Sequence, residues 1–412
     1  MRDLLFLSHR IPYPPDKGEK IRGWNLLGHL AQSYNIHLGC LIDDAADWQH
    51  LPLLRERCAE VAAFGIDRRW QKLFALARAR PGRPLMLDYY RHRGLLRWVD
   101  DLLARRRMDV LYIYSAAMAP YVLRHDAGAH RHAGGLRVLD MQDIDSEKWA
   151  AYAGRSAWPM RLVWAREGRT LLAYERRAAA ACDNTLFVTE AEARRFVTLA
   201  PESAGRVDWL ENGVDLAQFN PALDFANPYA GLPGDGPDLV FTGNMDYWPN
   251  VDAAVWFAEN VLTRLQRIHA GLRLHVVGAN PALQVKRLVE RPGVYVTGRV
   301  PDVRPYVAHA ALAVAPLRIA RGIQNKVLEA MAMAKPVVAS RQAFEGIHAT
   351  PGRDLLVGDG APAMVQDVLD ILDGRYPGLP AAARAAVEAR YSWPAQLVRL
   401  DRVLAGGGER TA

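Results

Sequence analysis

The sequence predicts an α/β protein made of two units, each with a parallel sheet covered by helices. The chain has 412 residues, of which 50% are apolar and 24% are charged. This length exceeds what one hydrophobic core usually supports, and the composition is typical of a globular protein with an ample core. Short apolar runs ending in polar or glycine turns alternate with helical patterns, as in parallel strands joined by crossover helices.

The apolar runs locate the expected strands. In the first half we expect strands at 4–8, 36–42, 110–114, 137–141 and 185–189. In the second half we expect strands at 239–242, 272–277, 294–297, 312–315, 337–339 and 355–357. The long stretch 146–181 has a helical pattern and is expected to be mostly helical.

A change of composition marks the domain boundary. Residues 224–238 contain three prolines and three glycines with few large apolar side chains, which is typical of a linker. We therefore expect an N-terminal domain at 1–223, a linker at 224–237 and a C-terminal domain at 238–390. Residues 391–412 are expected to form a final helix and tail.

Cysteine usage and hydropathy indicate the cellular compartment of the protein. Cys40, Cys58 and Cys182 show no metal-ligand spacing and are odd in number, so we expect neither a disulfide framework nor a zinc site. The N-terminal apolar run is too short for a signal peptide, and no apolar stretch is long enough to cross a membrane. A cytoplasmic protein is the expectation.

The positive charge lies in one half of the chain. The formal net charge is +7; residues 1–200 hold 31 Lys and Arg against 23 Asp and Glu, whereas the remainder holds 21 against 22. Such an excess is typical of surfaces that face nucleic acid, an anionic membrane or a phosphorylated substrate, and equally of scattered solvated arginines.

The first candidate segment is a loop that leads into a helix. The strand at 4–8 is followed by a proline-rich loop containing Lys17 and Gly18, and then by a helical pattern at 21–31 that includes Arg22. A glycine beside unpaired helix amides and basic side chains favours phosphate binding. A rigid turn with a solvated basic edge explains the same residues.

The second candidate segment is a polar loop, a helix and a strand at 321–339. Lys326 and Glu329 are three residues apart and share a helix face, whereas Val327, Leu328 and Met331 can pack against the protein. One face could thus offer a cation to a diphosphate and a carboxylate to sugar hydroxyls. A surface ion pair is the alternative interpretation.

Two motifs in the second half resemble retaining glycosyltransferase family 4. Residues 325–332 with 335–339 resemble the donor-site helix and strand of that family, and 212–215 with 219–221 resemble its NGVD…F.P motif. The resemblance implies a GT-B fold: two Rossmann-like domains facing across a cleft, with a C-terminal helix that crosses back to the N-terminal domain. It also implies that the first domain binds the acceptor and the second binds the nucleotide-sugar donor.

Three further segments resemble a smaller group of proteins within this family. Residues 12–20, 140–146 and 243–252 resemble sugar transferases associated with bacterial exopolysaccharide and PEP-CTERM systems. This implies a hexosyltransferase-like enzyme that works in exopolysaccharide biosynthesis.

The resemblance also assigns roles to residues. Glu329 matches the second glutamate of the E-x7-E motif, which binds the nucleotide ribose, whereas the first glutamate falls at Arg321. Lys326 is the expected cation for the leaving group, and Asp143 takes the position of the aspartate in the family's HD pair. The other expected donor-binding residues are Gly322, Ile323, Gln324, Asn325, Gly18, Lys17, Arg22, Gly243, Arg299 and Arg321.

The expected reaction moves a sugar, with retention, from a UDP- or GDP-linked donor to a lipid-linked or oligosaccharide acceptor. Neither a metal nor another cofactor is expected, and nucleic acid is not an expected partner. A nonhydrolysing nucleotide-sugar 2-epimerase shares the architecture and is the main alternative. A nicotinamide oxidoreductase lacks its GxGxxG motif here, and a basic nucleic-acid-binding protein lacks a recognised module.

The basic half also predicts a membrane contact. In the stretch 146–181, three tryptophans lie among arginines, a composition suited to an anionic lipid interface on the inner face of the cytoplasmic membrane. The residues are Trp149, Trp158, Trp164, Arg155, Arg161, Arg166, Arg169, Arg176 and Arg177. A packed helix with solvated arginines is the alternative.

Overall fold

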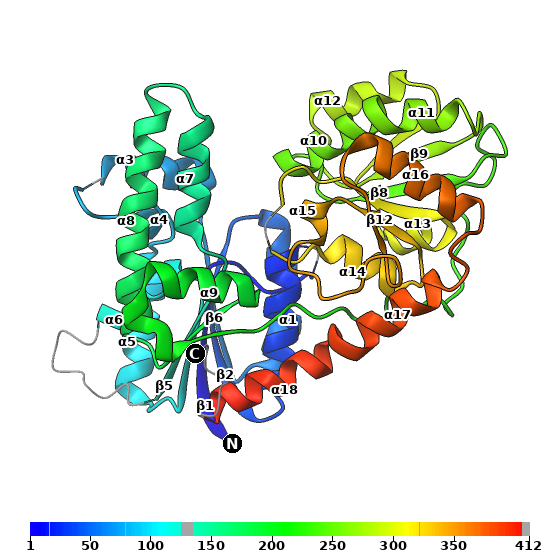
Figure 1. The fold of residues 1–412 in the computed structure, drawn as a ribbon. Helices are drawn as coiled ribbons and strands as arrows, with labels where there is room; N and C mark the ends of the chain where they lie inside the picture. The colour runs from blue at the N-terminus through cyan, green and yellow to red at the C-terminus, as the bar shows by residue number, and fades with distance from the viewer. Residues whose placement is uncertain (16, 79, 125–134, 321, 406–412) are drawn as a thin grey trace. The chain divides into compact units, whose positions relative to one another are not determined.

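The computed structural model describes residues 1–15, 17–78, 80–124, 135–320 and 322–405. It divides into two compact units. Unit 1 comprises Met1–Glu211 and the chain from Leu397 onward, and unit 2 comprises Asn212–Gln396. Each unit is a parallel sheet with helices on its faces, which confirms the predicted fold class (Figure 1). In this division 212–237 belongs to unit 2, and the linker at 224–237 stays a prediction.

Unit 1 is built on a seven-stranded parallel sheet in the order β3-β2-β1-β4-β5-β6-β7. Its strands are β1 Arg2–Ser8, β2 Tyr34–Ile42, β3 Glu60–Gly65, β4 Val110–Tyr114, β5 Leu136–Gln142, β6 Asn184–Phe187 and β7 Val207–Trp209. The inner strands are buried on both faces, so their sequences are continuous apolar runs. The sequence analysis missed β3 and β7, which lie at the two edges of the sheet and have weaker apolar patterns.

Helices flank this sheet. They are α1 Gly18–Leu30, α2 Leu51–Arg57, α3 Arg68–Ala77, α4 Leu85–Tyr89, α5 Arg93–Arg105, α6 Pro120–Leu123, α7 Asp145–Arg155, α8 Met160–Ala180 and α9 Glu190–Leu199. The stretch predicted to be mostly helical is the α7–α8 hairpin. Within the described residues, no helix combines the length and the apolar character needed to cross a membrane.

The last helix, α18 (Trp393–Leu404), joins unit 1 from Leu397 onward. His29 Nε2 lies 2.8 Å from Asp401 Oδ1, and Arg399 Nη2 donates to Asp208 Oδ1 at 2.7 Å. The Arg399 guanidinium also lies 3.8 Å from the centre of the Trp209 ring. These contacts attach the end of the chain to the domain in which it begins.

Unit 2 contains a six-stranded parallel sheet in the order β10-β9-β8-β11-β12-β13. Its strands are β8 Asp238–Thr242, β9 Arg273–Val277, β10 Val294–Gly298, β11 Leu312–Ala315, β12 Val337–Ala339 and β13 Leu356–Val357. Its helices are α10 Trp248–Phe257, α11 Thr263–Gln266, α12 Leu283–Lys286, α13 Arg304–His309, α14 Asn325–Ala332, α15 Arg341–Phe344, α16 Gly360–Leu372 and α17 Leu379–Arg390. All six strands predicted in this half are present.

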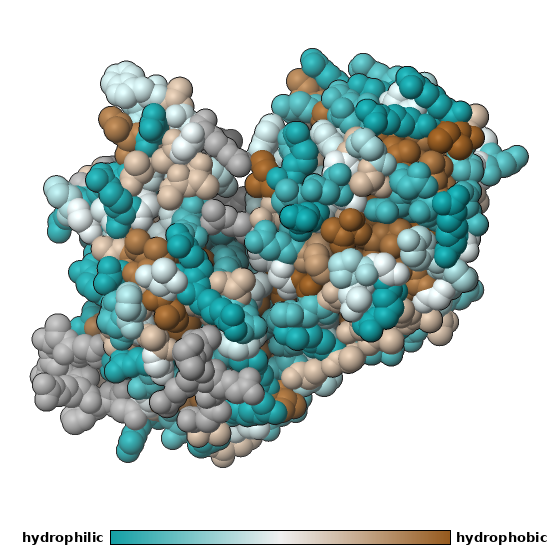
Figure 2. All heavy atoms as spheres, in the orientation of Figure 1, coloured by the Kyte–Doolittle hydropathy of each residue, from teal (hydrophilic) through white to brown (hydrophobic). Residues whose placement is uncertain are grey.

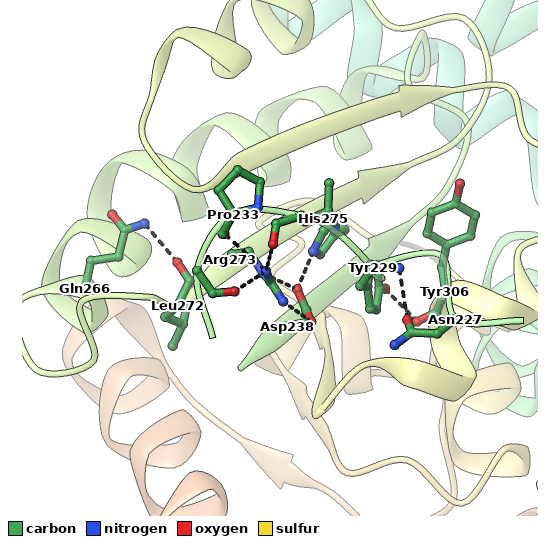
Figure 3. Close-up of polar contacts among 11 residues, drawn as sticks. Asn227, Tyr229, Pro233, Asp238, Gln266, Leu272, Arg273, His275 and Tyr306 are labelled. Carbon is green, nitrogen blue, oxygen red and sulfur yellow. Dashed lines mark hydrogen bonds and ion pairs between the residues drawn. The ribbon is translucent and has the colours of Figure 1, made fainter. Parts of the chain in front are cut away.

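A buried polar cluster lies at the amino ends of β8 and β9 (Figure 3). The Asp238 carboxylate accepts hydrogen bonds from Arg273 at 2.7 Å and lies 2.6 Å from His275 Nε2. Arg273 Nη1 also donates to the carbonyl of Gly234 at 2.7 Å, and the Tyr229 ring lies 4.1 Å from the His275 ring. The cluster therefore fastens the proline- and glycine-rich stretch before β8 to unit 2.

Two glycines let the ends of β8 and β9 approach each other. Gly243 and Gly278 have φ of +156° and +155°, and a Cβ at Gly278 would lie 1.7 Å from the carbonyl oxygen of Gly243. Backbone atoms cannot yield as a flexible side chain does. Any larger residue at position 278 must separate the two strand ends.

We expect Gly278→Ala to destabilise the folded chain by about 3 kcal/mol, because the methyl group overlaps backbone atoms. Chemical denaturation of the full chain measures this change. Gly374→Ala is the matched control: Gly374 has φ +73° but no atom within 4 Å of the added Cβ. Its expected cost is about 1 kcal/mol, from the left-handed backbone alone. Equal losses for the two variants would contradict the close-approach argument.

Candidate functional site

The candidate site lies at the carboxyl edge of the unit 2 sheet. Gly243 follows β8, Arg299 follows β10, and α14 begins after the loop that leaves β11. The strand order changes direction at the neighbouring pair β8 and β11, where the chain proceeds outward to either side. Doubly wound sheets bind ligands outside the carboxyl ends of their strands at this kind of position.

Lys326 is held in a fixed position on α14. Its Nζ donates to Asn250 Oδ1 at 2.5 Å and lies 4.7 Å from the centre of the Phe241 ring. Asn250 is 6% exposed, and its Nδ2 donates to the carbonyl of Asn244 at 2.9 Å. A Cβ at Gly243 would lie 3.0 Å from Lys326 Nζ, so a glycine there makes room for the amine. The arrangement presents a positioned amine at the edge of the sheet.

The sequence analysis identified Lys326 but missed its partners. Asn250 lies 76 residues earlier in the chain, near the start of α10, and Phe241 lies within β8. The sequence does contain one signal that points to Asn250: it is an asparagine in the otherwise largely apolar helix α10.

Glu329 lies one helical turn beyond Lys326, and both side chains are half-buried. Burial lowers the pKa of Lys326 to about 7 and raises the pKa of Glu329 to about 7, and in each case the opposite charge of the other residue partly offsets the shift. Among the described residues, no hydrogen bond to the Glu329 carboxylate is found. A ligand hydroxyl can therefore fill this position.

The N-terminus of α14 completes the site. Its N-cap residue, Gln324, is extended and offers no capping side chain, and Gly322 before it has φ of +66°. Asn325 begins the helix and Ile323 is buried. Uncapped amides and the helix dipole favour an anion, and Lys326 adds a cation beside them.

Two arginines are predicted to bind the donor, and the structure describes one of them. Arg299 is exposed just beyond β10, at the carboxyl edge of the unit 2 sheet. Arg321 lies outside the described residues. Its predicted contact with the donor is untested.

A small pocket lies beneath Lys326. Its interior volume is about 10 Å³, roughly the room that one water molecule needs, and its walls come from β8, β11, β12, α13 and α14. Typical ligand pockets are far larger, at roughly 300–1,000 Å³. We therefore regard it as a gap under the site rather than a place for a sugar.

In unit 1, the predicted loop begins a helix as expected. Gly18 is the first residue of α1 and is exposed, and Lys17 before it is half-buried and provides no side-chain cap. These two residues lie beyond the carboxyl end of β1 and are accessible to a ligand. Lys20, in contrast, is buried and pairs with Asp47 at 2.8 Å.

Arg22, which the sequence predicts to bind the donor, lies in the interior of unit 1. Its side chain is 1% exposed, its Nε donates to Asp140 Oδ2 at 2.9 Å, and its Nη1 donates to the carbonyl of Leu210 at 2.6 Å. Tyr112 donates to the same carboxylate oxygen at 2.8 Å. Arg22 therefore connects α1, β4, β5 and the end of the sheet from within the core.

Asp143 directly follows β5 at the carboxyl edge of the unit 1 sheet. It accepts a hydrogen bond from Lys148 at 2.6 Å, and Lys148 also donates to Asp145 at 3.0 Å. Glu192 on α9 is a further neighbour: burial and the charge of Asp143 raise its pKa to about 8. The sequence analysis missed Lys148 and Glu192, which make Asp143 part of a charged group.

Comparisons with known proteins agree with this architecture. Residues 236–374 match the family described as "Glycosyl transferases group 1". A D-inositol 3-phosphate glycosyltransferase from Mycolicibacterium smegmatis is 28% identical over 241 residues, which cover 53% of this chain and 52% of that protein. The match thus spans about half the length of this curated relative.

Solved structures match over nearly the whole chain. Anabaena Alr3699/HepE in complex with UDP and glucose superposes with a TM-score of 0.68 at 14% identity, covering 98% of this chain and 100% of that chain. Sucrose-phosphate synthase from Thermosynechococcus elongatus gives a TM-score of 0.72 at 17% identity, covering 98% and 99%. The fold is therefore the GT-B fold.

The fold is thus that of GT-B structures, and the part of the chain at 236–374 is similar to group 1 glycosyltransferases. The candidate site of Lys326 and Glu329 lies inside this matched segment.

Proposed function

We propose that the protein transfers a sugar from a UDP- or GDP-linked donor to an acceptor hydroxyl. The observation that carries the proposal is the Lys326 amine, fixed by Asn250 on the same N-terminal turns of α14 as Glu329, whose carboxylate has no hydrogen bond among the described residues. Support also comes from the similar Anabaena structure, which was solved with UDP and glucose.

The chain's own groups account for donor binding and activation. The α14 amides and Lys326 would hold the diphosphate, and Glu329 would accept hydrogen bonds from the ribose hydroxyls. In transfer, the bond from the anomeric carbon to the diphosphate oxygen breaks and a bond to the acceptor oxygen forms, while the acceptor proton passes to the leaving phosphate. Preorganised amides and a lysine stabilise the charge that grows on that phosphate. We propose that these groups suffice without a divalent ion.

The finer assignment rests on the resemblance of the sequence motifs. We propose a retaining reaction in exopolysaccharide biosynthesis, with a lipid-linked glycan as the acceptor and the inner face of the cytoplasmic membrane as the location. Asp143, held by Lys148, is the group we propose to position the acceptor hydroxyl. Gly18 and Lys17 are proposed to contact the donor phosphates.

Product analysis tests the proposal. The purified protein is incubated with UDP- and GDP-linked sugars, with and without lipid-linked oligosaccharides. The proposal predicts release of the nucleoside diphosphate and an acceptor extended by one sugar in the donor's anomeric configuration. A changed nucleotide sugar formed without any acceptor would instead identify a 2-epimerase.

The charges at the site predict a pH optimum for nucleotide binding. The diphosphate needs Lys326 protonated, and the ribose hydroxyls need Glu329 ionised. Since the pKa of each group lies at about 7, affinity for the nucleoside diphosphate should fall on both sides of neutrality. Calorimetric titrations over a pH series measure this dependence.

Two variants test which residue causes the loss of affinity on the acid side and which causes the loss on the alkaline side of the pH profile. Lys326→Arg keeps its charge, so the alkaline loss should disappear; Glu329→Gln cannot ionise, so the acid loss should disappear. A profile that keeps both limbs in both variants would exclude these two residues as its source.

A further inference from the structure

Unit 1 carries a concentration of exposed apolar side chains outside the proposed site. Among the described residues of this unit, nine large apolar residues are more than a third exposed, and six of them lie on α3 and around the turn of the α7–α8 hairpin. The six are Trp70, Phe74, Tyr152, Trp158, Met160 and Leu162, which we call the aromatic surface. Their exposed fractions range from 42% at Met160 to 79% at Trp158.

The hairpin displays Trp158 at its turn because other aromatic residues hold the two helices together. Trp149 on α7 stacks on Trp164 on α8, with ring centres 4.8 Å apart, and both are half-buried. Trp158 lies in the turn between the helices, and Leu162 is 62% exposed in the first turns of α8. Of the three tryptophans that predicted a membrane contact, only Trp158 is thus exposed.

Helix α3 adds a second aromatic face that the sequence analysis did not include. Trp70, Phe74 and Arg78 follow one another at helical spacing and are all exposed. The two rings lie 6.2 Å apart, and the Arg78 guanidinium lies 5.5 Å from the Phe74 ring centre. An arginine placed over exposed rings is suited to a boundary between an apolar layer and anionic groups.

The two parts of the aromatic surface are joined at α8. Arg166 Nη2 donates to the carbonyl oxygens of Arg80 at 2.5 Å and Arg83 at 3.0 Å, just beyond the end of α3. The Glu167 carboxylate accepts hydrogen bonds from the amides of Leu85 and Met86 at the start of α4. Figure 1 shows α3 beside the α7–α8 hairpin. One connected part of unit 1 therefore displays both aromatic faces.

The positive charge of the segments that carry the aromatic surface indicates what kind of partner would bind there. Residues 67–83 and 155–169 together contain ten Lys and Arg but only two Asp and Glu. Of the two acids, Glu167 is buried and paired with backbone amides. Figure 2 shows pale and brown residues among teal ones at the hairpin end of unit 1. Tryptophan and leucine surrounded by arginine match the acyl boundary and the anionic headgroups of a lipid surface.

We propose that the aromatic surface docks onto an anionic bilayer. The side chains of the hairpin turn and of the α3 face would enter the headgroup boundary, while Arg161 and Arg169, both exposed on α8, contact lipid phosphates. The proposal deepens the proposed function, because it explains how an enzyme without a membrane helix in its described residues would reach a lipid-linked acceptor. Binding itself requires no sugar transfer.

Vesicle sedimentation of the full chain tests the docking. Vesicles of phosphatidylcholine alone are compared with vesicles that also contain phosphatidylglycerol, each at low and high salt. We expect binding to the anionic vesicles only, weakened by salt. Trp158→Ser with Leu162→Ser, or Trp70→Ser with Phe74→Ser, should each weaken the partition about tenfold or more, because two apolar side chains no longer leave water.

Matched variants in unit 2 control for general effects. Ile268→Ser with Val289→Ser removes residues that are 61% and 56% exposed and should leave vesicle binding unchanged. Arg161→Glu with Arg169→Glu should abolish the preference for anionic vesicles, whereas Arg264→Glu with Arg267→Glu, also at exposed positions, should not. Thermal unfolding followed by circular dichroism shows whether each variant is folded.

Three results would overturn the proposal: no binding to anionic vesicles, equal losses for the unit 1 and unit 2 variants, or self-association that the aromatic-surface variants abolish. The last would identify a second copy as the occupant. Failure of the proposed function is distinguishable, because a protein that binds vesicles but no nucleotide sugar contradicts the transferase and not the docking.

Discussion

Lys326→Met should lower kcat/KM for sugar transfer about 1,000-fold, or about 4 kcal/mol, because the leaving diphosphate then loses its positioned cation. The amine is fixed by Asn250 and by the Phe241 ring, so water would not replace it in the same geometry. Methionine is unbranched and only one heavy atom shorter than lysine, so the variant removes the charge with little loss of packing. Initial rates with the donor identified in the product assay measure the effect.

Lys335→Met provides the control for charge removal. Lys335 is half-buried and lies in the connection from α14 to β12. It follows the C-terminal end of α14, whereas Lys326 lies at the N-terminal end. The rate should change less than about twofold, because no transition-state charge develops there. Asn250→Ala should reduce the rate and also move the alkaline limb of the pH profile, since the amine loses its hydrogen-bond acceptor. If Lys326→Met retained most of the wild-type rate, Lys326 would have no part in leaving-group stabilisation.

Glu329→Ala should weaken nucleoside diphosphate binding about 100-fold, or about 2.7 kcal/mol, because hydrogen bonds to an ionised carboxylate are among the stronger ones. The carboxylate carries no hydrogen bond among the described residues, so its removal disrupts little else in unit 2. Calorimetry with the free nucleoside diphosphate and with the nucleoside monophosphate should show the same loss, because both contain the ribose.

The control for this variant is Glu290→Ala, at an exposed position elsewhere in unit 2. It should bind the nucleotides with unchanged affinity. The comparison of nucleotides also distinguishes the two site residues: Lys326→Met should weaken the diphosphate more than the monophosphate, whereas Glu329→Ala should weaken both equally. Equal patterns for the two variants would contradict the separate roles.

The inner strands of unit 2 were predictable because they are largely buried in a parallel sheet and therefore read as apolar runs. The edge strands β3 and β7 were not, since an edge strand needs no continuous apolar run. The glycines after β8 and β9 marked strand ends in the sequence. Their close approach, however, depends on the pairing of strands more than 30 residues apart, which the sequence alone does not display.

Single charged residues were predicted less well than strands. Arg22 and Lys326 both follow a polar loop and lie on the first turns of a helix. The difference between them comes from distant residues: Asp140 takes the guanidinium of Arg22 into the core, whereas Asn250 holds the amine of Lys326 at the sheet edge. Local sequence places a charge near a strand end, and its role depends on side chains contributed by other strands and helices.

The most direct test of the proposed donor site is a crystal structure of the chain with UDP or GDP bound, chosen by calorimetric affinity. The diphosphate should lie within hydrogen-bonding distance of the α14 amides and of Lys326 Nζ, with a ribose hydroxyl on Glu329. A nucleotide bound elsewhere on unit 2, with Lys326 still paired only to Asn250, would contradict the account.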